Sequence, residues 1–269
     1  MYRRYQFYDG KSRICWKGYF ITGPKPWATL MTFCLTNIPS FLFYSLVLTK
    51  LDNSVVFLLM MLLFQLLFNI FMLITCSTNP GIVPKLEVDM SLLHRISHTR
   101  TYNIRYPIHI NGKSMNQIFC TTWLVVRPPR WCHWYFCNNW VERFDHHCPW
   151  ISWCIGKRNY TFFVIFLTNL SSYLLLMLVL SMIVTIDVGF KEGLRHSITA
   201  LILSIYLFWV CLFVVTLNIY HFYIMTIGET TFENLKGIYR HRLNPFNHKN
   251  VLKNFVAQFL PYRGKFSLL

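Results

Sequence analysis

Cysteine and histidine gather in one short segment of the chain. Five of the nine cysteines and three of the ten histidines lie within the 35 residues between positions 120 and 154. Thiolate and neutral imidazole are the ligands that zinc prefers, and an imidazole beside a thiol also activates that thiol as a nucleophile. The segment is therefore expected to bind metal, to perform nucleophilic chemistry, or both. Its members are Cys120, Cys132, His133, Cys137, His146, His147, Cys148 and Cys154.

The tetrapeptide Asp145-His146-His147-Cys148 contains the parts of a nucleophilic site. It supplies a carboxylate to orient an imidazole, an imidazole to take a proton, and a thiol to attack. Two neighbouring histidines do not easily serve one centre, so a division of labour is expected. One histidine would act on the thiol and the other would bind metal.

The elements that must position this segment are hydrophobic. The chain has 269 residues, of which 54% are hydrophobic and 13% charged, and its mean hydropathy is +0.37. Soluble domains carry about twice that share of charge, so a purely soluble protein is disfavoured. Four stretches are long enough to cross a bilayer as helices, which predicts an all-α membrane protein. They run from Pro26 to Leu48, Ser54 to Cys76, Thr161 to Ile186 and Ile198 to Met225.

The net charge of +16 has two readings, nucleic-acid binding and basic cytosolic loops of a membrane protein. Lys and Arg are concentrated before the first stretch, between the second and third, and after the fourth. These segments are predicted to be cytosolic by the positive-inside rule, and no nucleic-acid partner is expected. The nine cysteines are an odd number, which disfavours a secreted disulfide scaffold, and their thiols are expected to face a reducing compartment.

The resulting organisation has five parts. Residues 1–25 form a cytosolic N-terminal segment and 26–76 the first two membrane helices. Residues 77–160 form a cytosolic loop that carries the cysteine-rich domain at about 118–160. Residues 161–225 form the third and fourth helices, and 226–269 a cytosolic tail.

Three runs in the loop, RPPRWCHWYFC, VERFDHHCPW and CIGKRNYTFF, resemble the cysteine-rich domain of the DHHC protein S-acyltransferases, also called palmitoyltransferases. Further motifs extend the resemblance to nearly the whole chain. Asn-Pro-Gly at 79–81 is similar to the family's Asp-Pro-Gly, and Thr-Thr-Phe-Glu at 230–233 matches its Thr-Thr-x-Glu. Asn-Pro-Phe at 244–246, followed by Asn254 and Phe255, is similar to the C-terminal segment of many members.

The resemblance implies a two-step transfer. Cys148 would attack the thioester of palmitoyl-CoA, become S-acylated, and pass the acyl group to membrane-proximal cysteines of substrate proteins. His146 would be the base, Asp145 its orienting carboxylate, and Thr231 a hydrogen-bond donor to Asp145. The acyl chain would occupy a cavity between membrane helices, because its burial is worth about 0.8 kcal/mol per methylene.

The resemblance also assigns binding residues around this site. Trp150 would line the mouth of the acyl cavity, and basic side chains would meet the phosphates of CoA. The membrane would be that of the endoplasmic reticulum or Golgi. The basic candidates are Arg127, Arg130, Lys157 and Arg158.

Members of the family hold two structural zinc ions, each through three cysteines and one histidine, and this sequence departs from that pattern. The first set keeps Cys120 and His133 but has Trp123 and Trp140 at cysteine positions. The second set keeps three ligands and has tryptophan at position 134. Indole does not bind zinc, and structural zinc is almost always four-coordinate. The first set is therefore incomplete, and so is the second unless Cys132 or water completes it. The ligands retained by the second set are Cys137, His147 and Cys154.

All three losses replace cysteine by tryptophan, which suggests a common cause. The codon UGA is read as cysteine in some genetic codes and as tryptophan in others. We hypothesise that Trp123, Trp134 and Trp140 are cysteines translated under the wrong code. Trp131 and Trp153 are not explained so directly.

Two alternatives to an active acyltransferase follow from the residues. One is a catalytically weak or inactive member that serves as a membrane scaffold, which the tryptophans favour. The other is a small channel or transporter, which would carry charge along an intramembrane pathway. The four stretches contain no Lys, Arg, Asp or Glu, which disfavours the second alternative.

Overall fold

A computed structural model describes residues 10–16, 20–51, 54–83, 105–120, 125–126 and 129–260. Four long helices run side by side: α1 (Pro26–Leu46), α2 (Ser54–Ser77), α4 (Tyr160–Glu192) and α5 (Leu194–Ile227). Each is long and apolar enough to cross a membrane. The protein is therefore a multi-pass membrane protein, as the sequence predicts.

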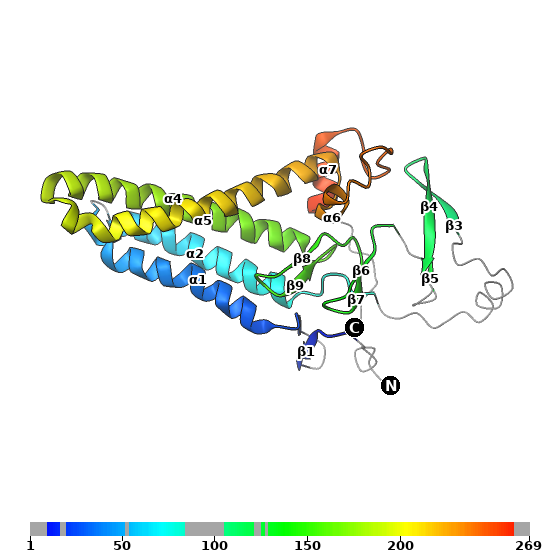
Figure 1. Cartoon of the computed structure of the whole chain (residues 1–269), viewed down its shortest axis with the longest axis horizontal. Helices are drawn as coiled ribbons and strands as arrows, with labels where there is room; N and C mark the ends of the chain where they lie inside the picture. Colours follow the sequence, from blue (N-terminus) through cyan, green and yellow to red (C-terminus); the bar gives the residue numbers. More distant parts are fainter. Residues whose placement is uncertain are drawn as a thin grey trace.

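The strands and the two short helices after α5 gather at one end of this bundle, which we call the strand-bearing end (Figure 1). It carries three antiparallel pairings of two strands and one sheet of three. The strands are β1 (Arg13–Cys15), β2 (Phe20–Thr22), β3 (Arg105–Ile110), β4 (Lys113–Cys120), β5 (Val125–Val126), β6 (Cys132–Trp134), β7 (Asn139–Val141), β8 (His146–Cys148) and β9 (Trp153–Ile155). A 3-10 turn (Leu48–Lys50) follows α1, and two short helices, α6 (Thr231–Leu235) and α7 (Val251–Phe259), follow α5.

The expected four helices, with the cysteine-rich region between the second and third, are confirmed, but that region is built from short strands and turns. Its turns place Arg130, Asn138, Arg143 and Ser152 at positive φ. Such backbone reverses direction within a few residues, and a helix cannot accommodate it. The term "all-α" thus holds for the membrane part alone.

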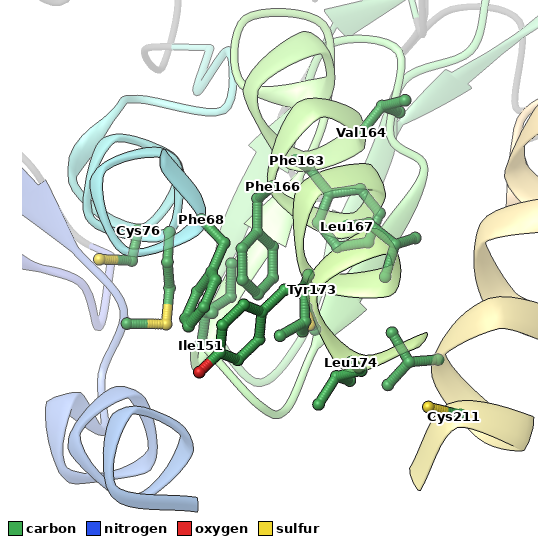
Figure 2. Packing of buried hydrophobic residues seen from close by; sticks show 14 of the residues in the cluster. Phe68, Cys76, Ile151, Phe163, Val164, Phe166, Leu167, Tyr173, Leu174 and Cys211 are labelled. Atoms are coloured by element: carbon green, nitrogen blue, oxygen red, sulfur yellow. The ribbon is translucent and has the colours of Figure 1, made fainter. Parts of the chain in front are cut away.

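Helix α4 is the centre of the bundle. It packs along α2 on one side and α5 on the other, and its inward side chains form the core in Figure 2. Tyr173 is fully buried against Phe68 of α2, with ring centroids 5.1 Å apart. Apolar residues such as Phe41 and Leu59 point outward and are more than half exposed, which suits a surface in contact with lipid.

A polar network joins α1, α2 and α4 inside the bundle. Gln65 Nε2 donates to Asn37 Oδ1 at 2.7 Å, and Asn69 Nδ2 donates to the same oxygen at 3.1 Å. Tyr44 donates to Gln65 Oε1 at 2.8 Å and lies 3.1 Å from the Tyr173 hydroxyl. Interhelical hydrogen bonds of this kind hold helices together where apolar burial gives no driving force.

The Asn-Pro-Gly turn fastens the end of α2 to the cysteine-rich region. Asn79 Oδ1 accepts hydrogen bonds from the backbone N–H groups of Gly81 and Ile82 at 2.9 and 2.7 Å, so asparagine closes the turn through its carbonyl oxygen. Pro80 O lies where a Cβ on Gly156 would come within 2.6 Å. Position 156 therefore requires glycine, because backbone passes directly over it.

Candidate active site

The β8–β9 hairpin separates the two neighbouring histidines. Successive side chains of a strand point to opposite faces, so His146 and Cys148 share one face of β8 while His147 lies on the other. In the register of the hairpin, Cys148 pairs with Trp153 and His147 with Cys154. The strand geometry thus places the two imidazoles on opposite faces, as a division of labour between them would require.

On the first face, the carboxylate of Asp145 holds the His146 ring. Asp145 Oδ2 lies 2.7 Å from His146 Nδ1. An ionised carboxylate can only accept, so Nδ1 donates and Nε2 is the nitrogen left for the thiol. The Cys148 thiol lies on the same face of β8 and contributes to the raised pKa of His146. Carboxylate, imidazole and thiol thus follow one another on this face.

Helix α6 fixes the other oxygen of the same carboxylate. Asp145 Oδ1 accepts from the backbone N–H of Thr231 at 2.9 Å, and Asp145 O accepts from Phe232 N at 3.0 Å. The Thr231 hydroxyl is buried and makes no hydrogen bond among the described residues. The expected contact between Thr231 and Asp145 is therefore made by the backbone, and a capping box between Thr230 and Glu233 holds that backbone in place.

The electrostatics of the pair follow from burial and contact. Burial alone would raise the pKa of Asp145, but its hydrogen bond with His146 and the positive charge there lower that pKa to about 2. Burial alone would lower the pKa of His146, but its bond to Asp145 and then the neighbouring Cys148 raise that pKa to about 9. Asp145 is thus a carboxylate at neutral pH, and His146 binds a proton readily.

On the second face, three side chains converge as a metal site would require. The ligand atoms of Cys137, His147 and Cys154 all lie within 4.8 Å of one another. His147 Nδ1 is 3.4 Å from Cys137 Sγ and 3.7 Å from Cys154 Sγ. A hydrogen bond from Cys154 and the neighbouring His147 lower the pKa of the Cys137 thiol to about 6. Thiolate and imidazole are zinc ligands, so this trio fits a metal ion.

The fourth side of the trio is occupied by an indole. The ring of Trp134, at the end of β6, stacks on His147 with centroids 5.8 Å apart. Trp134 Nε1 is buried and makes no hydrogen bond among the described residues. Cys132, which we considered as a substitute ligand, is not part of the trio. The described residues therefore give this site three protein ligands.

The other expected zinc set does not fit a metal ion in its described part. His133 Nε2 lies 3.1 Å from Asn138 Oδ1, and its ring packs against Trp140 at 5.6 Å. The side chain of Cys120 and the whole of Trp123 lie outside the described residues.

Comparison with known proteins decides the family. Residues 113–238 match the family model described as DHHC palmitoyltransferase. "Probable protein S-acyltransferase 3" of Arabidopsis thaliana is 33% identical over 96% of this chain and 68% of its own length. "Protein S-acyltransferase 8" of the same plant is 31% identical over 98% of the chain and 70% of its length. The chain belongs to the DHHC palmitoyltransferase family.

The match reaches animal proteins as well. "Palmitoyltransferase ZDHHC9" of Danio rerio is 30% identical over 67% of this chain and 51% of its own length. Membership makes the chain a protein S-acyltransferase enzyme. The arrangement of Asp145, His146 and Cys148 is then the natural candidate for the active site of this acyltransferase.

In this acyltransferase the remaining residues expected at the site differ in exposure and in contacts. Trp150 is 42% exposed and packs on Phe213 of α5 with centroids 6.2 Å apart. The side chain of Arg130 is 10% exposed, with Nε and Nη2 donating to the carboxylate of Glu233 at 2.8 and 2.7 Å and its guanidinium over the ring of Phe246. A guanidinium held in this way braces the fold, and it is not presented to a ligand.

The two basic residues after the hairpin lie beside the Asn-Pro-Gly turn. Lys157 is paired with Glu142 and partly exposed, and Arg158 N donates to Pro80 O at 3.3 Å. Arg127 lies outside the described residues. Asn159 is fully buried and donates to Thr75 O and Cys154 O.

Sequence reasoning missed two buried residues of the site. His221 of α5 has its ring 5.7 Å from that of His146, and a lone histidine inside an apolar stretch was the signal that could have found it. Arg143 donates to Gln258 O at the end of α7 at 2.7 Å. Burial and then the nearby Arg130 lower the pKa of Arg143 to about 10.

Proposed function

We propose that this enzyme transfers a long-chain acyl group, such as palmitate, from acyl-CoA to cysteine thiols of substrate proteins through an S-acyl intermediate on Cys148. The observation that carries the proposal is the hydrogen bond between buried Asp145 and His146, whose imidazole has a raised pKa and shares a strand face with Cys148. Such an arrangement activates a thiol, because the imidazole accepts its proton while the carboxylate holds the ring.

In the first step, His146 Nε2 takes the proton of Cys148, and the sulfur attacks the carbonyl carbon of acyl-CoA. The bond between that carbon and the CoA sulfur breaks, and the CoA thiolate takes the proton from His146. In the second step a substrate cysteine gives its proton to His146 and attacks the acyl carbon. The Cys148 sulfur leaves and recovers the proton. Each step exchanges one thioester for another, so activation and placement matter more than driving force.

An apolar groove between α1 and α5 offers space for the acyl chain. Its volume is about 500 Å³, and it is lined from Met31 to Leu42 on α1 and from Thr199 to Tyr206 on α5. Thr32 Oγ1 donates to Trp150 O at 2.5 Å, so the Met31 end of the groove lies near the turn that follows Cys148. The eleven helical steps from Met31 to Leu42, at about 1.5 Å each, carry the groove about 16 Å into the bundle. We assign this groove to the acyl chain and Trp150 to its mouth.

For the CoA phosphates we retain Arg127, Lys157 and Arg158 and remove Arg130, whose guanidinium is occupied by Glu233. The Cys137–His147–Cys154 trio would hold a zinc ion with a structural role, away from the reacting thiol on the opposite face of β8. The strand-bearing end would face the cytosol, where acyl-CoA is available, and the membrane would be that of the endoplasmic reticulum or Golgi. Substrate cysteines would lie close to that membrane.

The test is direct detection of the intermediate. The purified full chain is incubated with a fatty acyl-CoA analogue, and a hydroxylamine-labile adduct is expected on Cys148 and absent from Cys148→Ser. Cys211→Ser, which removes a buried membrane thiol, is the matched control and should leave the adduct unchanged. Failure of the wild type to form any adduct would support the scaffold alternative, which the incomplete zinc sets favour.

A further inference from the structure

A second imidazole lies against the Asp145–His146 pair, on its membrane side. His221 of α5 is 1% exposed. One of its ring nitrogens, a carboxylate oxygen of Asp145 and a ring nitrogen of His146 lie within 4.8 Å of one another. A polar ring is therefore placed where the apolar bundle meets the buried charged pair.

The orientation of His221 is fixed by a partner from another helix. Its Nδ1 lies 3.3 Å from the hydroxyl of Tyr160, the first residue of α4. Tyr160 is itself 3% exposed. Burying a polar group costs free energy unless it is hydrogen-bonded, and this bond satisfies both side chains at once. This hydrogen bond joins the start of α4 to the C-terminal part of α5 next to His146.

His146 is enclosed between two rings on this side. The ring of His221 lies at 5.7 Å and that of Phe163 at 5.1 Å, the latter edge-on at 68°. His221 and Phe163 also contact each other at 5.0 Å. Asp145 holds the His146 ring only at Nδ1. Rotation of the imidazole about that hydrogen bond is therefore restrained by the two neighbouring rings. Nε2 must stay aimed at Cys148 through both steps of the transfer.

We infer that His221, held by Tyr160, is a positioning residue that keeps the His146 ring aligned with Cys148 and presents a polar surface to the Asp145–His146 pair. The inference rests on the proposed acyl transfer for its catalytic meaning. Leucine at position 221 would fill the space but lose the bond to Tyr160, whereas asparagine can keep that bond. A displacement of about 1 Å in a reacting group costs on the order of 10²-fold in rate.

The experiment compares His221→Leu, His221→Asn and Tyr160→Phe in the full chain. His196→Leu, at the exposed far end of the same helix, is the matched control. Acyl-enzyme formation is measured over a range of acyl-CoA concentrations, and thermal unfolding of each variant is recorded. For His221→Leu we expect the maximal rate to fall by about 10- to 100-fold with little change in KM, and His221→Asn should recover most of the loss.

Alkylation of Cys148 by iodoacetamide, resolved by peptide mass spectrometry, gives a second readout that needs no acyl-CoA. Slower alkylation in His221→Leu than in the wild type and His221→Asn is expected. Equal alkylation and acylation rates in all variants would overturn the inference. Equal losses in His221→Leu and His221→Asn, accompanied by a lowered unfolding temperature, would reduce His221 to a packing residue and overturn it too. If the wild type forms no adduct, the proposed transfer fails while the alkylation rates still decide the role of His221.

Discussion

The indole of Trp134 lies on the imidazole of His147 with the two planes inclined by 17°. His147 and its two thiol neighbours form a three-ligand set whose fourth side is this ring. Trp134 Nε1 is buried without a hydrogen bond among the described residues, an arrangement that costs about 1–3 kcal/mol for a polar group. The site therefore has the shape of a metal centre with one ligand replaced.

Trp134→Cys should complete that site. Position 134 precedes Cys137 by three residues, the spacing of a Cys-x-x-Cys pair, and would add a thiolate beside Cys137, His147 and Cys154. We expect the purified variant to bind about one more equivalent of zinc than the wild type and to unfold at a higher temperature, because metal binding adds directly to folding free energy. Metal analysis and thermal unfolding with and without a chelator measure both effects.

Trp131→Cys is the matched control for this substitution. It introduces a thiol in the same loop at a position that the ligand pattern does not use, so zinc content should not change. An equal gain of zinc in both variants would mean that any added thiol recruits metal, and the assignment of position 134 would fall. The wrong-code hypothesis has its own test in the gene, where UGG at positions 123, 134 and 140 would contradict it.

Asp145→Asn should slow acyl-enzyme formation by about 10²-fold or more. The amide no longer carries the charge that raises the pKa of His146, and it can present an N–H instead of an acceptor to Nδ1. Single-turnover acylation at saturating acyl-CoA measures the effect. Asp187→Asn, which removes an exposed carboxylate paired with Lys191, should retain the full rate. A variant at Asp145 as fast as that control would remove the carboxylate from the mechanism.

Much of the architecture could be predicted from the sequence because long apolar stretches have few ways to fold. The expected helix starting at Ser54 begins there in the structure, and the one expected to end at Met225 runs on to Ile227. Longer helices at α4 and α5 went unpredicted, because residues such as Lys191 and Arg195 end an apolar pattern without ending a helix.

The sequence predicts the part of the site whose residues are adjacent in the chain. It does not reveal the contacts that the fold makes between distant residues. Asp145, His146 and Cys148 share one motif, and their contact follows from a strand. The bond from Thr231 is made by backbone, which residue types do not reveal. Likewise, Arg130 pairs with the distant Glu233 and is not available to a phosphate. Only the fold shows that this basic residue has an acidic partner.

The Arg130–Glu233 pair should contribute strongly to stability. Its side chains are 10% and 5% exposed, and removing one partner of a buried ion pair leaves an uncompensated charge that typically costs about 3–5 kcal/mol. Glu233→Ala is therefore expected to lower the unfolding temperature sharply and to disturb α6, whose capping box it closes. Lys191→Ala breaks an exposed i,i+4 pair with Asp187 and should cause no measurable change. Similar unfolding temperatures for both variants would contradict a buried role.

Narrowing the deep end of the α1–α5 groove should change the acyl chain that the enzyme accepts. Thr199 and Leu42 line that end, whereas Met31 lines the end near Trp150. Thr199→Phe would fill space that only the last carbons of a long chain reach, and each excluded methylene forfeits about 0.8 kcal/mol of burial. We expect adduct formation with sixteen- and eighteen-carbon donors to fall while shorter donors keep their rate. Ile205→Phe, which lies in a separate hollow between α4 and α5, should leave the preference unchanged. A uniform loss across chain lengths in Thr199→Phe would place the acyl chain elsewhere in the bundle.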